Sequence, residues 1–303
     1  MIVPEPGWEE LVDRLMKLRG AVLFLGRSDS GKSTLVRYLA GQLLAGGVTV
    51  ALVDADVGQS FLGLPGTVSR RTFTAPVEEP ARFTWQHLTF LGSVTPAPIL
   101  SLLAAETGRM VLASRQEARV TLIDTTGLVS GPLGLALKLA KIRATAPELV
   151  VAVSAGAELD PIVAAMPDFT GTLRLSPSPM VQRRTPTQRI RYRYGKLAAH
   201  LHGARVTLVA TRRLLFMHRG APVHPLFTPP EAGTVVGLNH QGETRALGVV
   251  NEADAESITV LTPLRSLRGV DRVILGDFSY TPLPLHAVPG RGAATSPAGE
   301  VRT

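Results

Sequence analysis

The sequence predicts an α/β fold: a parallel sheet with flanking helices, followed by a small C-terminal all-β domain. Two observations lead to this prediction. Short apolar runs alternate with helical patterns over roughly the first two hundred residues, which is typical of a parallel sheet. From about residue 204 onward the chain reads as short strands separated by turns, without a helical pattern.

The individual elements follow from hydrophobic spacing. Leu11, Leu15 and Leu18 recur at helical intervals between Trp8 and Arg19, which predicts a first amphipathic helix. Strands are expected at 21–25, 48–54, 87–92, 120–127, 149–154 and 172–176. Further helices are expected at about 33–45, from residue 98 through 105, at about 133–145, and after Pro186.

Three parts of the chain are expected to differ in structure. Residues 1–203 form the α/β domain, with a mobile lid at about 181–202. Residues 204–287 form the β-rich domain, in which Asn239–Glu243 reads as a hairpin turn. Residues 288–303 are small and polar and are expected to be a disordered tail.

Composition excludes several classes of protein. The 303 residues include no cysteine, so disulfide frameworks, thiolate metal sites and a cysteine nucleophile are excluded. No apolar run approaches the ~20 residues of a membrane-spanning helix. Four acids precede any positive cluster at the N-terminus, which is unlike a secretory signal. A cytoplasmic location without a membrane partner is therefore expected.

Positive charge is concentrated in one segment. The chain has 32 Lys and Arg against 24 Asp and Glu, a net charge of +8. Between Phe169 and Pro230 there are 11 Lys and Arg and no acid, so the rest of the chain is close to neutral. A localised cationic segment favours a phosphate-bearing partner over diffuse electrostatic adhesion.

The strongest motif is GRSDSGKST at Gly26–Thr34, which fits G-x-x-x-x-G-K-[ST] between a predicted strand and a predicted helix. Its backbone N–H groups can surround phosphates at a helix N-terminus. Lys32 is expected to reach the β- and γ-phosphates, and Ser33 to ligate Mg²⁺. The motif predicts a P-loop NTPase sheet that binds a nucleotide. The residues expected to bind it are Gly26, Ser28, Asp29, Ser30, Gly31, Lys32, Ser33 and Thr34.

Two strands end in acids. Asp54 and Asp56 of DADVGQ are two residues apart and so share a strand face, where a carboxylate can hold Mg²⁺ through water or accept a proton. The alternative is a pair of solvated strand-end acids. DTTG at Asp124–Gly127 fits the D-x-x-G of GTPases, but no [NT]-K-x-D motif accompanies it. A simple strand-ending turn is the alternative.

The run VQRRTPTQRIRYRYGK at Val181–Lys196 contains six Lys and Arg residues and no acid. Arg189 and Arg193 are four residues apart on the helix expected after Pro186, and Arg184 precedes it. Arginines on one side of a mobile helix can close over a triphosphate and a transferring phosphoryl group. The alternative is a solvated basic helix face.

Together these motifs resemble the polynucleotide 5′-hydroxyl kinase family, which includes the RNA kinase of the pre-mRNA 3′-cleavage complex and its ribosomal-RNA-processing relatives. The resemblance covers roughly residues 20–280. It rests on SDSGKST (28–34), DVGQSFLGLPGT (56–67), FLGSVTP (90–96), TTGL (125–128) and RTPTQRIRYR (184–193). Leu128 departs from the family pattern, which has tryptophan there.

The resemblance implies an ATP- and Mg²⁺-dependent kinase acting on 5′-hydroxyl ends of RNA or DNA. Asp56 would be the general base and, with Ser33, a Mg²⁺ site, while Lys32, Arg184, Arg189 and Arg193 would stabilise phosphate charge. The acceptor strand would contact Gln59, Thr95, Thr125, Thr126 and Gly127. Two other interpretations stay open: a catalytically silent ATP-binding scaffold of an RNA-processing assembly, and a kinase for a small metabolite.

Overall fold

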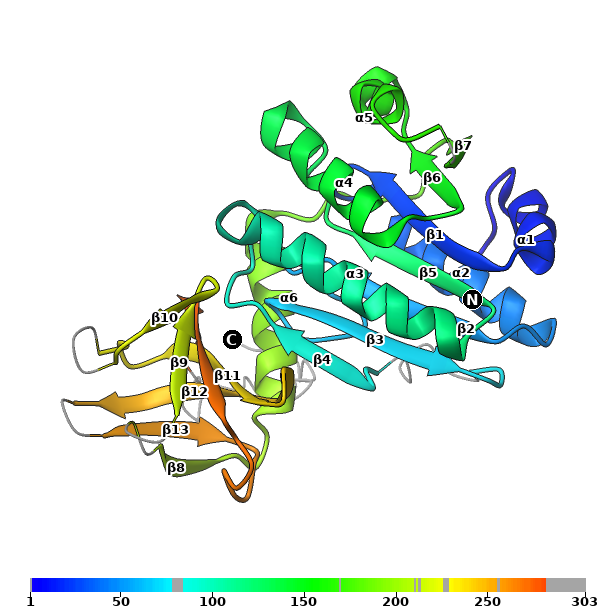
Figure 1. Cartoon of the computed structure of the whole chain (residues 1–303). Coiled ribbons are helices and arrows are strands. Elements are labelled where there is room, and N and C mark those ends of the chain that lie inside the picture. The colour runs from blue at the N-terminus through cyan, green and yellow to red at the C-terminus, as the bar shows by residue number, and fades with distance from the viewer. Residues whose placement is uncertain are drawn as a thin grey trace, which may run out of the picture.

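The computed structural model describes residues 2–77, 84–168, 170–209, 211, 214–225, 229–254 and 257–281. The described chain forms two units, each built on a seven-stranded sheet (Figure 1). The expected tail at 288–303 lies outside the described residues. Among the helices described, none is long and apolar enough to cross a membrane.

The first sheet has the strand order β4-β3-β2-β5-β1-β6-β7. Its strands are β1 (Gly20–Gly26), β2 (Val50–Ala55), β3 (Thr67–Phe73), β4 (His87–Phe90), β5 (Val120–Thr125), β6 (Leu149–Val153) and β7 (Gly171–Leu175). The five strands from β2 to β7 in this order run parallel, which confirms the predicted α/β class. β3 and β4 extend the sheet by antiparallel pairing.

Strand β3 was not expected from the sequence, because Arg70 and Arg71 interrupt its apolar pattern. The structure explains how an arginine is accommodated there. Arg70 is buried and donates two hydrogen bonds, of 2.7 and 3.0 Å, to the carboxylate of Glu117. This pairing across 47 residues satisfies the buried charge and is invisible to local spacing.

Helices cover both faces of this sheet (Figure 1). They are α1 (Trp8–Lys17), α2 (Lys32–Ala45), α3 (Leu100–Glu117), α4 (Gly131–Thr145), α5 (Asp160–Ala164) and α6 (Pro186–His200), with short 3₁₀ turns at Ala97–Ile99 and Ala157–Leu159. Alternate strand residues divide the core: Val22 and Phe24 pack with α1 and α2, whereas Leu23 and Leu25 pack with α3 and α4. The carboxyl ends of the parallel strands therefore lie between two helical layers.

The second sheet has the order β10-β9-β14-β11-β12-β13-β8. Its strands are β8 (Arg205–Val209), β9 (Leu215–His218), β10 (Ala221–Val223), β11 (Thr234–His240), β12 (Glu243–Ala253), β13 (Ile258–Thr262) and β14 (Arg272–Ser279). β11 and β12 form the hairpin expected at Asn239–Glu243. Its two turn residues, Gln241 and Gly242, have φ values of 50° and 87°, as a type I′ turn requires.

The two units share an apolar core around β4 and the C-terminal half of α6. Phe90 packs against Phe278, and its backbone N–H donates a 2.8 Å hydrogen bond to the Thr244 hydroxyl. A Cβ at residue 237 would lie 2.7 Å from the Phe90 ring. Strand β11 can therefore approach Phe90 this closely only because residue 237 is glycine. Leu197 and Leu201 of α6 join this core. Helix α6 is thus fixed at one end by the β-rich unit.

Candidate active site

The phosphate-loop motif forms a tight turn between β1 and α2. Gly31 and Asp29 have φ values of 87° and 57°, and a Cβ at Gly26 would lie 2.6 Å from the Val153 carbonyl oxygen. The Lys32 ammonium group donates to the Arg27 carbonyl at 2.7 Å, so the loop wraps around its own lysine. Burial lowers the pKa of Lys32, and nearby carboxylates oppose that shift. This is the cradle that the spacing predicted.

The Ser33 hydroxyl, in the first turn of α2, donates a hydrogen bond to the carboxylate of Asp124 on β5. Asp124 is buried, and burial together with the nearby Asp54 carboxylate raises its pKa to about 7. A hydroxyl and a carboxylate in contact are hard oxygen donors of the kind Mg²⁺ takes alongside phosphate oxygens and water. The pair therefore fits Mg²⁺, and Asp124 is a site residue that the sequence did not assign.

No group of three or more His, Asp or Glu side chains able to hold a metal occurs within the described residues. Few protein ligands are needed for a cation that is carried with a nucleotide. The sequence could not identify Asp124 as a partner of Ser33, because the two residues are 91 positions apart. They meet only because strands β1 and β5 are neighbours in the sheet.

Asp54 and Asp56 have different roles: Asp54 lies within strand β2, and Asp56 follows the last residue of that strand, Ala55. Asp54 is buried and accepts hydrogen bonds from the Ser60 hydroxyl at 2.8 Å and from the Phe61 and Leu62 backbone at 2.8 and 2.9 Å. It organises the loop that follows and does not reach the cavity. The interpretation that both acids face the site is therefore wrong for Asp54.

Asp56 lies on the cavity wall. Its Oδ1 accepts hydrogen bonds of 3.0 Å from the backbone N–H groups of Gly58 and Gln59. Among the described residues, Oδ2 of Asp56 makes no hydrogen bond that would occupy it. One oxygen is held by the loop, and the other can receive a proton.

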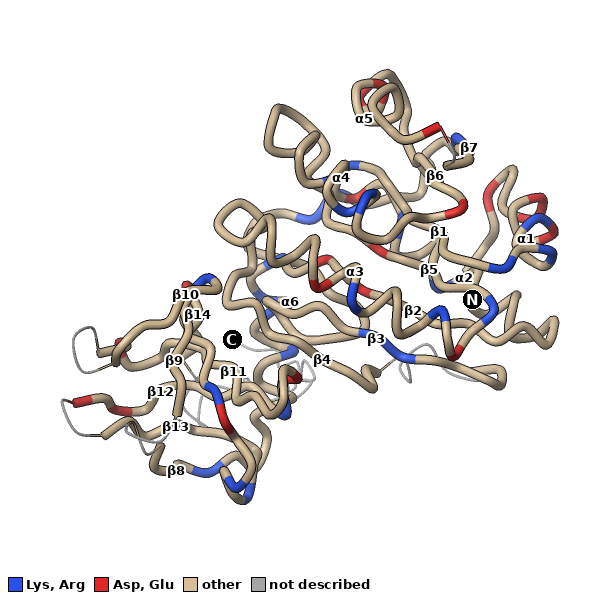
Figure 2. The backbone as a smooth tube through the Cα atoms, in the orientation of Figure 1, with Lys and Arg blue, Asp and Glu red and all other residues tan. Residues whose placement is uncertain are grey.

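The lid is docked on the phosphate loop. Thr185 and Gln188 form a capping box that begins α6. Arg189 forms a 2.5 Å ion pair with Asp29, and Arg184 donates to the Gln59 side chain at 3.3 Å. Figure 2 shows Lys and Arg recurring along α6, which carries no Asp or Glu. The predicted lid helix is thus present and contacts both the phosphate loop and the DVGQ loop.

Two further α6 side chains hold the DVGQ loop. The Tyr192 hydroxyl donates to the Ser60 carbonyl at 2.9 Å. Lys196 donates to the carbonyls of Phe61 and Gly63 at 2.9 and 2.8 Å. Burial lowers the pKa of Lys196 and raises the pKa of Tyr192 to about 12. These contacts join the lid to the carboxylate-bearing loop as well as to the phosphate loop.

The lid, the phosphate loop and Asp56 enclose a cavity of about 1200 Å³. It brings together the predicted Ser28–Thr34, Asp56, Gln59, Arg184 and Arg189. Residues that the sequence did not assign also line it: Arg37, Phe61, Arg183, Arg191 and Tyr192. Gly26 lies beneath the loop, and neither Arg193 nor Thr95 is part of the lining.

The predicted acceptor residues of the DTTG turn are not open to a ligand through their side chains. Thr125 is buried, donates to the Phe24 carbonyl at 2.7 Å and accepts from Lys138 at 2.9 Å. Thr126 is also buried. A Cβ at Gly127 would lie 2.3 Å from the Ser28 backbone nitrogen, so the turn packs directly on the phosphate loop. The structure gives these residues a supporting position.

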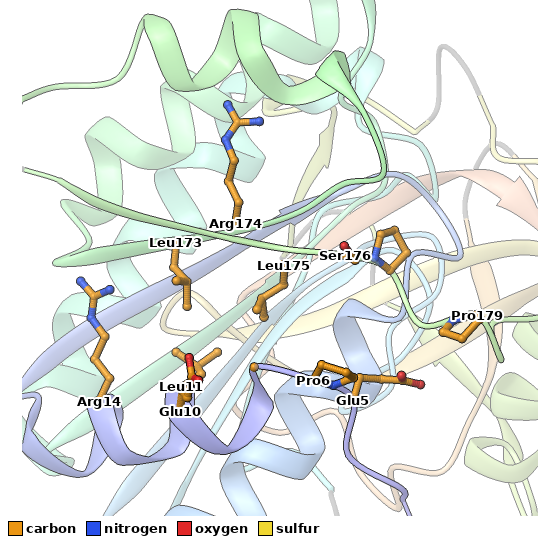
Figure 3. A pocket seen from close by; sticks show the side chains of 12 residues that line it. Glu5, Pro6, Glu10, Leu11, Arg14, Leu173, Arg174, Leu175, Ser176 and Pro179 are labelled. Atoms are coloured by element: carbon orange, nitrogen blue, oxygen red, sulfur yellow. The ribbon is translucent and has the colours of Figure 1, made fainter.

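A second hollow, of about 730 Å³, lies between α1 and β7 (Figure 3). Leu173 and Leu175 point toward α1 there, while Arg174 points away. None of the predicted site residues lines this hollow. The phosphate loop, Asp56 with Gln59, and the lid line the larger cavity instead.

A sequence model of the mRNA cleavage and polyadenylation factor CLP1 P-loop matches residues 26–203, more than half of the chain. The chain belongs to that family. The matched span in this CLP1 P-loop protein runs from the phosphate loop to the end of the lid. It therefore contains every side chain that lines the cavity except those contributed by the N-terminal segment.

Curated relatives include the polyribonucleotide 5′-hydroxyl-kinases of Thermococcus kodakarensis and Pyrococcus furiosus. They are 36% and 34% identical over 162 and 191 residues, which are 54% and 62% of this chain and 46% and 53% of theirs. The Clp1 polyribonucleotide 5′-hydroxyl-kinase of Xenopus tropicalis is 29% identical over 197 residues, 62% of this chain and 45% of that protein. The chain spans about half the length of the curated relatives it matches.

The solved structure of a wild-type Clp1p–Pcf11p complex is similar to this CLP1 P-loop chain, with a TM-score of 0.74 and 13% sequence identity. The superposition covers 90% of this chain and 79% of that one. At this identity the likeness concerns the fold alone. It confirms the predicted arrangement of a P-loop α/β unit followed by a β-rich unit.

Proposed function

We propose that the chain transfers the γ-phosphate of ATP to the 5′-hydroxyl end of RNA. The observation that carries this proposal is the position of Asp56. It lines the same cavity as the phosphate loop and lid arginines, and one carboxylate oxygen is engaged by backbone N–H groups while the other is not. A nucleotide-binding cavity that also holds a carboxylate suits activation of a hydroxyl acceptor. The names of the relatives support RNA as the acceptor.

In the proposed phosphoryl transfer, each group of site residues has a separate role. The N–H groups of the phosphate loop and Lys32 bind the triphosphate. The Ser33 hydroxyl and the Asp124 carboxylate, which are in contact, would hold Mg²⁺, and the ion would neutralise charge on the phosphate oxygens. Asp56 accepts the proton of the 5′-hydroxyl as its oxygen bonds to phosphorus, and ADP departs with the electrons of the broken P–O bond.

The lid arginines supply positive charge where the transferring group develops negative charge. Arg184 and Arg189 of the lid line the same cavity as Lys32. In this structure Arg189 pairs with Asp29, whose carboxylate also accepts from the Arg184 backbone at 3.2 Å. A nucleotide phosphate would compete with Asp29 for the guanidinium group.

Arg193 and the DTTG turn have supporting roles in this proposal. Burial and the nearby Arg189 lower the pKa of Arg193, which is held on the same helix face one turn further on. Gly127 lets the turn pack on the phosphate loop, and Gln59, joined to Arg184 and to the Arg189 carbonyl, ties the lid to the loop of Asp56. We assign an acceptor contact to Gln59, which lines the cavity, and none to Thr95, which does not.

A transfer assay tests the proposal. ATP labelled at the γ-phosphate is incubated with Mg²⁺ and an RNA oligonucleotide that has a 5′-hydroxyl end, beside the same oligonucleotide with a 5′-phosphate and a matched DNA. We expect label on the 5′-hydroxyl RNA and none on the 5′-phosphate RNA. Lys32→Met should abolish transfer, whereas Lys17→Met, on the exposed face of α1, should leave it unchanged.

The other two interpretations predict different outcomes. A scaffold would bind ATP without transferring label to any acceptor. A small-metabolite kinase would label a nucleoside or similar small hydroxyl compound, and its acceptor affinity would not depend strongly on salt. Either result would contradict the proposed function.

A further inference from the structure

Two lysines of α4 are fully buried. Lys138 and Lys141 lie three residues apart on the side of α4 that faces the sheet, and neither exposes any side-chain surface. Lysine is almost never fully buried unless its ammonium group has partners. These two lysines must therefore contribute something that an apolar side chain in the same place could not.

Their partners are the two turns that carry the candidate catalytic groups. The Lys141 ammonium group donates to the Ala55 carbonyl at 2.9 Å, and Ala55 immediately precedes Asp56. The Lys138 ammonium group donates to the Thr125 hydroxyl at 2.9 Å and to the Thr126 carbonyl. Each lysine thus reaches the carboxyl end of a different strand, β2 for Lys141 and β5 for Lys138.

The contacts of Lys138 continue to the phosphate loop. The Thr125 hydroxyl in turn donates a hydrogen bond to the Phe24 carbonyl of β1 at 2.7 Å. Gly127, the next residue after Thr126, packs on the Ser28 backbone. Lys138 is therefore connected through Thr125 to β1 and through the 125–127 turn to the phosphate loop, whereas Lys141 holds the residue that precedes the DVGQ loop.

We propose that Lys138 and Lys141 are positioning residues of the phosphoryl-transfer site, with Lys141 fixing the Ala55–Asp56 peptide and Lys138 fixing the 125–127 turn against the phosphate loop. The inference rests on the proposed function. It goes beyond it because neither lysine touches the cavity, and both act through backbone and hydroxyl oxygens. A lysine nitrogen donates hydrogen bonds whether or not it carries a charge, so the role does not depend on titration.

Hydrogen–deuterium exchange on the nucleotide-free protein tests the two anchors separately. In Lys141→Met we expect exchange at 56–62 to rise about tenfold, the change that follows loss of one hydrogen bond of ordinary strength, while exchange at 125–127 stays unchanged. In Lys138→Met we expect exchange to rise at 125–127 and to stay unchanged at 56–62. Lys17→Met, a matched change at an exposed lysine, should alter neither segment. Unchanged exchange at 56–62 and 125–127, or a rise throughout the chain, would overturn the proposal.

Kinetics provide the second readout. In Lys141→Met we expect kcat to fall roughly 10²-fold, as for a reacting group misplaced by about 1 Å, with KM for ATP unchanged within about threefold. A parallel loss of ATP binding would contradict a role confined to Asp56. If the wild type transfers no phosphate but the exchange results hold, the proposed function fails and the anchoring role stands.

The absence of cysteine allows a rescue experiment. Lys141→Cys introduces the only thiol in the chain. Alkylation with 2-bromoethylamine in denaturant, followed by refolding, rebuilds a lysine analogue with its amino group at the original reach. We expect the alkylated variant to regain wild-type exchange at 56–62, and the wild type taken through the same treatment to be unaltered. Refolded alkylated protein that retains the fast exchange of Lys141→Met would contradict the anchoring role.

Discussion

Gly127→Ala adds a single methyl group between the DTTG turn and the phosphate loop. The new Cβ would lie 2.3 Å from the Ser28 backbone nitrogen and 2.6 Å from its Cα. Ordinary contact requires about 3.5 Å, so the two backbones must separate by about 1 Å. Neither is a flexible side-chain end that could turn aside. Because displacement of this size costs on the order of 10²-fold in a positioned reaction, we expect nucleotide binding and transfer to weaken together.

Titration with a fluorescent ATP analogue measures the loss of affinity, and thermal unfolding reports stability. Gly41→Ala is the matched control, because Gly41 lies within α2 with no atom close to the added methyl group. That control should retain affinity and gain stability, since alanine is the better helix residue by about 1 kcal/mol. If Gly127→Ala binds the analogue with wild-type affinity, contact between the turn and the phosphate loop does not shape the nucleotide site.

Three further predictions concern the lid and the buried acids. Arg189→Ala should lower kcat by roughly 10³-fold, in line with the loss of an arginine from a phosphoryl-transfer site, and steady-state kinetics at saturating ATP check this. Gly195→Ala, on the open side of α6, should raise the free energy of unfolding by about 1 kcal/mol in urea denaturation, and a destabilised variant would contradict the helix geometry. Burial raises the pKa of Asp124 to about 7, so the folded chain keeps a proton that the unfolded chain releases above about pH 4. The wild type should therefore lose stability between pH 4 and 7, and Asp124→Asn should lose less; equal slopes in nucleotide-free urea titrations would refute this.

Local sequence information was sufficient where function depends on adjacent residues. The phosphate loop needs glycines, Lys32 and Ser33 within nine positions, and all of that chemistry is contiguous. The lid helix is likewise visible in sequence, because Thr185-Pro186 begins it and the arginines repeat along it. The hairpin at Gln241-Gly242 is set by turn residues alone.

Contacts between distant segments could not be derived in this way. Asp124 meets Ser33 only because β5 lies beside β1, and the sequence cannot state strand order. The spacing of Asp54 and Asp56 predicts that they share a strand face, yet β2 ends at Ala55 and the loop that follows folds around the Asp54 carboxylate. Thr125 belongs to a recognised motif, but its hydroxyl is used within the core.

The partners of the buried lysines also lie far away in the sequence and could not be derived from it. Lys138 and Lys141 lie in a largely apolar helix, GPLGLALKLAKIRAT, on its buried face. A charged residue on the buried face of a predicted helix indicates a polar partner beneath it. The pattern could therefore have drawn attention to these positions. Identifying the Ala55 carbonyl and the 125–127 turn as the partners required the fold.

The central claim is that Asp56 activates a 5′-hydroxyl beside a nucleotide held by the phosphate loop. The most direct measurement is single-turnover transfer of labelled γ-phosphate to a 5′-hydroxyl RNA by the wild type and by Asp56→Asn, with ATP affinity measured on both. We predict rapid transfer by the wild type and loss of transfer by at least about 10²-fold in Asp56→Asn, with ATP binding retained. Equal transfer rates for the two proteins would contradict the claim.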